Sequence, residues 1–162
     1  MNGAMSDLPR SAVRVQDAAT ALGLDITVVE MPESTRTAEE AAAACGCALG
    51  QIVKSLIFRG AASQKPYLLL VSGTNRVDEK KVAEEIGEGL ERPDAGFVRD
   101  TTGFAIGGVA PFGHAQPLEC YMDRDLTAHD VVWAAAGTPK CLFSVEPNAL
   151  GTAARARIIA VT

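Results

Sequence analysis

Apolar residues near the start of the chain recur at the spacing of an amphipathic helix. Residues 12–22 show this pattern, with Ser11 before them as a candidate N-cap and Gly23 after them as a stop. Residues 26–29 then form a short run rich in β-branched side chains, which is typical of a strand. The chain is therefore expected to open with a helix followed by a strand.

Capping signals predict further helices. Thr37 and Glu40 form a T-x-x-E capping box ahead of an alanine-rich stretch that should end at Gly46. Asp78 is a candidate N-cap for a helix that should end at Gly87. Two shorter helical segments are expected, over residues 93–99 and from Pro147.

Continuous apolar runs separated by Gly/Pro turns predict strands. Residues 52–58 and 66–72 should pair as a hairpin in the middle of a sheet, and the apolar character of the second run implies burial on both faces. Later strands are expected at 118–122, 131–135, 141–145 and 158–161. We therefore expect an α+β fold, a single domain over residues 1–162 with a central mixed β-sheet flanked by helices. Residues 1–9 are expected to be disordered.

Composition is typical of a globular cytoplasmic protein. The 162 residues suit one domain, and the 48% hydrophobic content agrees with a sizeable core. No apolar run approaches the roughly 20 residues that cross a bilayer, and the N-terminus does not resemble an export signal, so no membrane partner is expected. A net charge of −5 argues against a broad nucleic-acid footprint, and no DNA partner is expected.

The charges are unevenly distributed. Residues 41–77 contain no acidic residue but include Lys54, Arg59, Lys65 and Arg76, so one edge of the fold could be locally positive. An ordinary solvated surface is the alternative. Residues 101–118 contain no Asp, Glu, Lys or Arg, which indicates core or the lining of a pocket.

No metal or other cofactor is predicted. The four cysteines lack the paired C-x-x-C spacing of a zinc site, and reduced structural thiols are the favoured interpretation for Cys45, Cys47, Cys120 and Cys141. The close spacing of the first two leaves a soft-metal or redox pair as the alternative. Asp123 and Asp125 could hold a cation, but a solvated turn also explains them.

Lys54 and a glycine-rich loop suggest a site for an anion or an oxyanion. Lys54 lies in an otherwise apolar run, where an ammonium is costly unless it meets an anion. A lysine whose head reaches solvent is the alternative. Residues 107–113 form an uncharged Gly/Pro loop, which can present backbone N–H groups to a closely approaching group. No G-x-S-x-G elbow or Ser/His/Asp pattern is present.

The order and spacing of these motifs resemble the YbaK/proline-tRNA-synthetase-associated editing domains, which are freestanding or inserted aminoacyl-tRNA deacylases. The resemblance covers nearly the whole chain and is carried by residues 37–42, 52–56, 71–78, Lys81 and 102–113. It implies hydrolysis of the ester that joins a wrong amino acid to tRNA. The implied partner is the acceptor end of a mischarged tRNA, with an aminoacyl-tRNA synthetase as a second candidate.

The resemblance also implies site residues. Lys54 and the G-x-x-x-P loop from Gly107 to Pro111 would form the active site, in which amides near Gly107 and Gly108 hold the oxyanion. Lys54 could act as an ammonium, the favoured role, or as a general base. Candidate substrate-binding residues are Thr35, Thr37, Val109, Pro111, Phe112, Gly113 and Ala136, and candidate RNA-binding residues are Arg76, Lys80 and Lys81. Trp133 is expected in the core. The hypothesis requires a cavity between the Lys54 amine and the proline-containing loop.

Substrate and function class stay open at this point. Family members that remove cysteine from proline tRNA carry a serine before the late glycine and an acidic residue on the next strand, whereas residues 134–137 here read Ala-Ala-Ala-Gly and residues 141–144 read Cys-Leu-Phe-Ser. Alanine, serine and threonine therefore stand beside cysteine as candidates, with proline tRNA as a candidate carrier. The alternatives to a trans-editing deacylase are a non-catalytic module that binds tRNA ends with a synthetase and a hydrolase of small esters.

Overall fold

A long hairpin forms the centre of the fold. In this computed structural model, which describes residues 8–162, β2 (Val53–Gly60) and β3 (Pro66–Ser72) pair antiparallel. On the other side of β3, β5 (Glu119–Asp123) and then β8 (Ala156–Ile159) add in parallel, and β4 (Leu90–Glu91) pairs with the far end of β2. The order β4-β2-β3-β5-β8 is a mixed sheet, so the predicted hairpin and its central position are confirmed.

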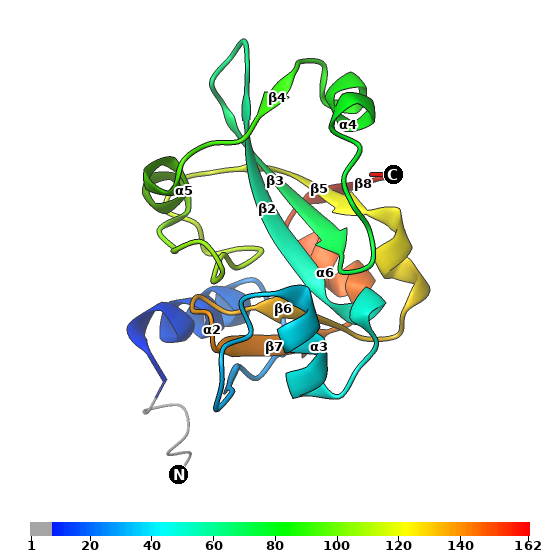
Figure 1. The fold of residues 1–162 in the computed structure, drawn as a ribbon. Coiled ribbons are helices and arrows are strands. Elements are labelled where there is room, and N and C mark those ends of the chain that lie inside the picture. The colour runs from blue at the N-terminus through cyan, green and yellow to red at the C-terminus, as the bar shows by residue number, and fades with distance from the viewer. Residues whose placement is uncertain (1–7) are drawn as a thin grey trace.

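A second, smaller sheet lies below the long hairpin (Figure 1). It consists of β1 (Val29–Glu30), β6 (Val132–Ala135) and β7 (Cys141–Val145) in the order β1-β7-β6. A single bridge between Ile52 and Trp133 connects it to the larger sheet. The α+β class and the central mixed sheet are confirmed, and the smaller second sheet is a feature that the sequence did not predict. Local patterns identified the late strands and could not show that they pair with each other rather than with the hairpin.

Five α-helices are present in residues 8–162, and most begin and end where the sequence indicates. They are α2 (Arg10–Ala21), α3 (Ala38–Cys45), α4 (Glu79–Ile86), α5 (Ala95–Thr102) and α6 (Pro147–Ala153), with 3-10 turns η1 (Leu49–Gln51) and η2 (Arg124–Ala128). The Thr37–Glu40 capping box, the Asp78 cap and the left-handed glycines at 46 and 87 are all confirmed. None of these helices is long and apolar enough to cross a membrane.

Near the N-terminus one prediction is wrong and a second, the strand at residues 26–29, holds only from Val29. Ser11 is not a cap, since α2 begins at Arg10 after Pro9 and has no side-chain cap. Residues 26–28 are not a strand because a side chain takes the place of a strand partner: Gln16 donates to the Ile26 carbonyl and accepts from the Val28 N–H, both at 3.0 Å. The predicted disorder of residues 1–9 concerns mainly residues 1–7, which lie outside the described range.

The larger sheet is covered on both faces. Leu68 and Leu70 of β3 belong to the main core, together with residues of α2, α6 and the small sheet. Leu69 and Val71 point to the other face and pack with Val82 of α4. All four leucine and valine side chains of β3 are fully buried, so the predicted two-sided burial is confirmed.

Candidate active site

One edge of β2 has no strand partner over most of its length. β4 pairs only with Arg59 and Gly60, and the bridge to the small sheet involves only Ile52. Between these points, no backbone hydrogen bond joins the outer side of β2 to any residue within 8–162. An edge of this kind presents free N–H and C=O groups, and the glycine-rich loop after α5 lies beside it (Figure 1).

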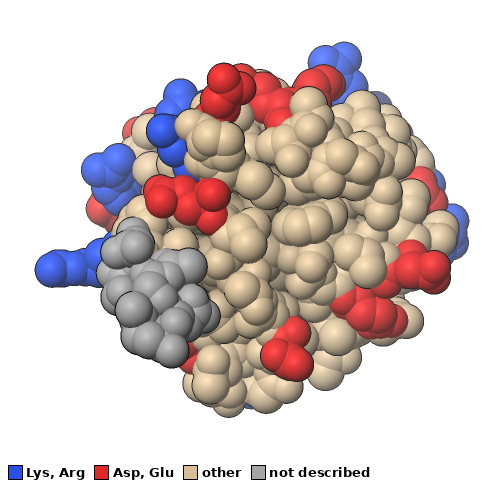
Figure 2. Space-filling model, turned by 90° about the horizontal axis from the view of Figure 1, so that it is seen from below, with Lys and Arg blue, Asp and Glu red and all other residues tan. Residues whose placement is uncertain are grey.

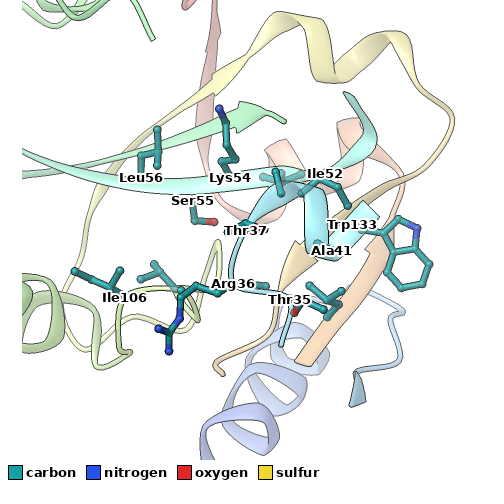
Figure 3. A pocket seen from close by; sticks show the side chains of 16 residues that line it. Thr35, Arg36, Thr37, Ala41, Ile52, Lys54, Ser55, Leu56, Ile106 and Trp133 are labelled. Carbon is teal, nitrogen blue, oxygen red and sulfur yellow. The ribbon is translucent and has the colours of Figure 1, made fainter. Parts of the chain in front are cut away.

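A cavity of about 280 Å³, here called the first cavity, lies along this edge. Its walls come from β2, from the segment that leads into α3, from the loop after α5 and from the small sheet (Figure 3). The lining residues are Thr35, Arg36, Thr37, Ala38, Ala41, Ile52, Val53, Lys54, Ser55, Leu56, Ile106, Gly107, Val109, Trp133, Ala135 and Leu142. Lys54 and Gly107, the two centres of the sequence-based hypothesis, therefore border one cavity.

Ser55 and Lys54 point to opposite sides of β2, as the alternation of a strand requires. Figure 3 shows the Ser55 hydroxyl directed into the first cavity and the Lys54 amine directed away from Ile106 and the glycine-rich loop. The Ser55 Oγ is buried and has no hydrogen-bond partner within the described chain. Because a buried hydroxyl without a partner is costly, this orientation suggests that it meets a substrate group or a water molecule.

The Lys54 amine is held by the loop that follows β3. Its Nζ donates to the backbone carbonyl of Asn75. The Asn75 side chain in turn donates to Asp123, a fully buried carboxylate, at 2.8 Å. Burial lowers the pKa of Lys54, the charges of Glu39 and Asp123 oppose this shift, and the charge of Arg76 adds to it. The structure therefore does not bring the amine and the Gly107 amide together, although a cavity lies between them.

The two loop glycines have different surroundings. Gly107 borders the first cavity with φ +92°, and its N–H has no acceptor within residues 8–162. The N–H of Gly108 already donates to the Ala105 carbonyl at 3.0 Å. A Cβ on Gly108 would lie 2.8 Å from the Thr138 backbone, so this glycine allows the loop to pack closely on the small sheet. Of the two predicted oxyanion donors, Gly107 is free in this structure and Gly108 is not.

Thr35 and Thr37 line the first cavity, but both hydroxyls have structural partners. Thr35 donates to the Pro139 carbonyl through its N–H at 2.6 Å and its hydroxyl at 2.9 Å. Thr37 accepts the Glu40 N–H at 3.1 Å as the cap of α3. Between them, Arg36 extends toward the loop that carries Ile106 (Figure 3). The segment is thus fixed at both threonines, and the long Arg36 side chain runs along the cavity wall.

Four other candidate residues lie apart from the first cavity. Pro111, Phe112 and Gly113 line a different surface hollow, and Phe112 is buried against Phe143 with ring centroids 5.5 Å apart. Ala136 is fully buried in the main core. The His114 Nε2–H donates to the Ala110 carbonyl at 2.7 Å and so helps to fix the loop. These residues shape the loop from behind, whereas Val109 lines the first cavity directly.

Of the candidate RNA-binding residues, only Arg76 lies at a cavity. Arg76 borders a second cavity, which lies beside the first. Lys81 donates to the Thr162 carbonyl at 2.6 Å, and Lys80 is exposed on α4. Neither lysine lines the first or the second cavity.

Sequence reasoning missed three residues with polar or aromatic side chains that line the first cavity. Trp133 was expected in the core, but it is half-buried and lines the cavity, because β6 lies at the edge of the small sheet next to Ile52. Ser55 and Arg36 were not singled out. The strand alternation around Lys54 could have identified Ser55 as a polar group on the opposite face. Arg36, between two threonines, carried no comparable signal.

The thiols and carboxylates do not form a metal centre in the described part of the chain. Within residues 8–162, no group of three or more His, Cys, Asp or Glu side chains is placed to hold a metal ion. Burial raises the pKa of Cys45 to about 11, and the nearby Cys47 adds to the shift. The interpretation of Asp123 as part of a solvated turn is wrong, because this residue is buried and accepts the Ser72 N–H at 3.0 Å.

The structure is an α+β domain with a mixed sheet and a cavity along a free strand edge, and Ser55, Lys54 and Gly107 border this cavity. Residues 32–152 match the family model of the aminoacyl-tRNA editing domain. Because the match covers most of the chain, this protein belongs to the aminoacyl-tRNA editing domain family, and the resemblance noted in the sequence is confirmed.

Individual relatives agree with this assignment. The chain is 47% identical to a crystal structure described as a candidate trans-editing enzyme for prolyl-tRNA synthetase, with a TM-score of 0.91 over 96% of this chain and 99% of that one. It is 35% identical to YwhH of Bacillus subtilis, a protein named as uncharacterized, over 76% of this chain and 78% of YwhH. It is 25% identical to EbsC of Enterococcus faecalis, named as a candidate Cys-tRNA(Pro)/Cys-tRNA(Cys) deacylase, over 73% of this chain and 72% of EbsC.

Proposed function

We propose that this protein is a trans-editing deacylase that hydrolyses mischarged aminoacyl-tRNA carrying a small amino acid, with proline tRNA as the candidate carrier. The observation that carries the proposal is the first cavity of an editing-domain family member, in which a partnerless Ser55 hydroxyl and a free Gly107 N–H border the same space. The relationship to the candidate prolyl-tRNA synthetase trans-editing enzyme supports the choice of carrier.

The chemistry needs few groups because an aminoacyl ester is already activated. Water attacks the ester carbonyl carbon, and the electron pair of the carbonyl moves onto its oxygen. The Gly107 N–H and the free amides of β2 can stabilise this oxyanion, with each donor worth about 10² to 10³ in rate. When the tetrahedral species collapses, the bond to the ribose oxygen breaks, and that oxygen leaves as a hydroxyl after taking a proton from the attacking water. The Ser55 hydroxyl can both accept and donate, so it suits the orientation of the water.

The choice of a small side chain is supported by the relationship to EbsC, which is named as a candidate Cys-tRNA deacylase. Ala38, Ala41 and Ala135 form part of the lining, and the cavity measures about 280 Å³ in total. Alanine, serine, threonine and cysteine are the candidates. A pocket discriminates one methyl or hydroxyl group by only about 1–3 kcal/mol, which is the energetic reason for a second, hydrolytic check on aminoacylation. A synthetase is the candidate partner because it would release the wrong product, and the activity belongs in the cytoplasm, where tRNA is charged.

A panel of tRNAs charged with Ala, Ser, Thr, Cys and Pro tests the proposal. We expect the purified protein to accelerate loss of at least one small, wrong amino acid from proline tRNA over many turnovers, and to leave correctly charged prolyl-tRNA intact. Ser55→Ala and Lys54→Ala are expected to slow the reaction. Loss of none of the five esters would contradict a deacylase and would favour the non-catalytic RNA-binding module.

A hydrolase of small esters is distinguished with free aminoacyl methyl esters. We expect turnover of aminoacyl-tRNA to exceed that of the matching methyl ester at equal concentration, since binding energy from the RNA contributes to the transition state. Equal turnover of the two would instead support the small-ester alternative.

A further inference from the structure

A second cavity, of about 400 Å³, continues from the first along the same edge of β2. The two share a wall made by Lys54, Ser55, Leu56, Ile106, Gly107 and Val109. The first cavity extends from this wall toward the Ile52 end of β2 and the second toward the Phe58 end. A molecule lying across the shared wall would therefore occupy both cavities at once, with its middle next to Ser55 and Gly107.

The second cavity differs from the first in charge. Its lining includes the cations Lys54, Arg76 and Arg92 and no acidic side chain. Arg92 also pairs with Glu79 at 2.9 Å, but its side chain is 78% exposed, so this pair leaves most of the guanidinium accessible. Residues 41–77, which contain no acidic residue, include four cations. Arg59 is paired with Glu91 and Lys65 with Glu119. The other two, Lys54 and Arg76, line the second cavity.

Most of the remaining lining is apolar. Val77, Pro93 and Val98 contribute to the floor, and the ring of Phe58 lies at its end with the Arg92 guanidinium 5.9 Å above it. Nucleobases pack on apolar and aromatic side chains, and arginine pairs with phosphate through its fork of donors. The surface seen from below, under α2 and the small sheet, instead carries scattered acidic side chains, with Lys and Arg only toward its edges (Figure 2). Electrostatics thus disfavours RNA on that face.

We propose that the second cavity binds the terminal nucleotides of the RNA 3′ end, with phosphate at Arg76 and Arg92 and a base against Val77 and Pro93, while the aminoacyl group lies in the first cavity. This inference rests on the proposed function, because it assigns the two parts of that substrate to two adjoining sites. It places the ester over the shared wall, beside Ser55 and Gly107. It also gives the Lys54 ammonium an anionic neighbour on the RNA side of β2.

The test uses Arg76→Gln and Arg92→Gln, with Arg157→Gln as a matched control. Arg157 is an exposed arginine paired with Glu85 at 3.1 Å, as Arg92 is paired with Glu79, but it lies on β8 at the opposite edge of the sheet. Binding of a labelled single-stranded RNA that ends in CCA is measured by fluorescence anisotropy over a range of salt concentrations. Deacylation is measured with aminoacyl-tRNA and with the aminoacyl methyl ester.

We expect Arg76→Gln and Arg92→Gln each to raise the Kd for the RNA about 3- to 10-fold. The slope of log Kd against log salt concentration should fall by about 0.7 for each phosphate that the variant no longer neutralises. The KM for aminoacyl-tRNA should rise with kcat little changed, turnover of the methyl ester should stay the same, and Arg157→Gln should behave as the wild type. Unchanged Kd and KM in both cavity variants would overturn the inference, as would an equal loss in the control or an absence of RNA binding by the wild type.

These outcomes separate the inference from the proposed function. Deacylation that is insensitive to Arg76 and Arg92 would remove the second site and leave the deacylase. RNA binding that depends on both arginines, without hydrolysis of any charged tRNA, would keep the second site and remove the deacylase.

Discussion

At the scale of single residues, Lys54 shows what a sequence can and cannot reveal. Its costly position in an apolar strand was predictable, because alternation and burial follow from local pattern. The direction of its amine was not, since the Asn75 carbonyl that receives it depends on how the loop after β3 turns back over the sheet. The same holds for Gly108, whose N–H is used inside its own loop.

The two roles considered for Lys54 predict opposite pH dependence. Burial lowers its pKa from the ordinary lysine value, so the amine loses its proton at a lower pH than a free lysine would. If the ammonium is required, the enzyme-catalysed rate falls as the pH rises through this lowered pKa. If the free amine is a base, the rate rises instead. The measurement is kcat/KM against pH after subtraction of spontaneous ester hydrolysis. We expect kcat/KM to fall as the pH rises. Lys54→Met should lower the rate about 10- to 100-fold and should abolish this fall.

Ser55→Ala should separate activity from stability. Because the Ser55 Oγ has no partner, its removal is expected to change the free energy of unfolding by less than about 0.5 kcal/mol, while deacylation falls about 10-fold or more. Ser72→Ala is the matched control, since the Ser72 hydroxyl donates to the Gly50 carbonyl at 2.8 Å in a buried position. It should cost about 1–3 kcal/mol. Chemical denaturation supplies the free energies, and an equal loss of stability in the Ser55 variant would contradict a functional role.

At the scale of elements, local capping signals predicted helices reliably, whereas a distant side chain that replaces a strand partner could not be predicted. The helices capped at Thr37 and Asp78 follow the sequence because both the cap and the glycine stop lie within the segment itself. The strand predicted at residues 26–29 is present only from Val29, because the backbone partner of Ile26 and Val28 is the side chain of Gln16. No pattern within the run itself could reveal that partner.

Gln16→Leu tests whether the Gln16 side chain takes the place of a strand partner. The variant leaves the Ile26 carbonyl and the Val28 N–H without their partner, so we expect a loss of about 1–3 kcal/mol in the free energy of unfolding. Gln116→Leu makes the same chemical change at an exposed position and should stay within about 0.5 kcal/mol of the wild type. Equal effects in the two variants, measured by urea denaturation, would refute the role assigned to Gln16.

At the scale of the whole molecule, strand identities were predictable and their assembly was not. Each late strand lies close to its expected position, yet β6 and β7 form their own sheet. The division matters for function, because the free edge of β2 and both cavities exist only where the small sheet and β4 stop short of the strand. The site is therefore created by pairing between strands that lie far apart in the sequence, whereas the local pattern identifies only the residues of the site.

His114 couples the loop to the stability of the molecule. Burial lowers the pKa of this imidazole from its ordinary value near 6.5, and its hydrogen bond to Ala110 opposes the shift. The unfolded chain therefore takes up a proton first as the pH falls, so stability is lost between the ordinary and the lowered pKa and is fully present above both. We expect thermal unfolding between pH 7 and pH 5 to show a smaller decline for His114→Gln than for the wild type. A decline for His114→Gln as steep as that of the wild type would contradict this role of His114.

The short length of the open β2 edge also bears on how this protein avoids sticking to itself. Unprotected strand edges invite other chains to add to a sheet and aggregate. Here the accessible stretch is closed at one end by β4 and at the other by the Ile52–Trp133 bridge, and the glycine-rich loop stands beside it. The closed ends limit the length of ladder that another chain could add at this edge, so free main-chain groups are presented with a reduced tendency to aggregate.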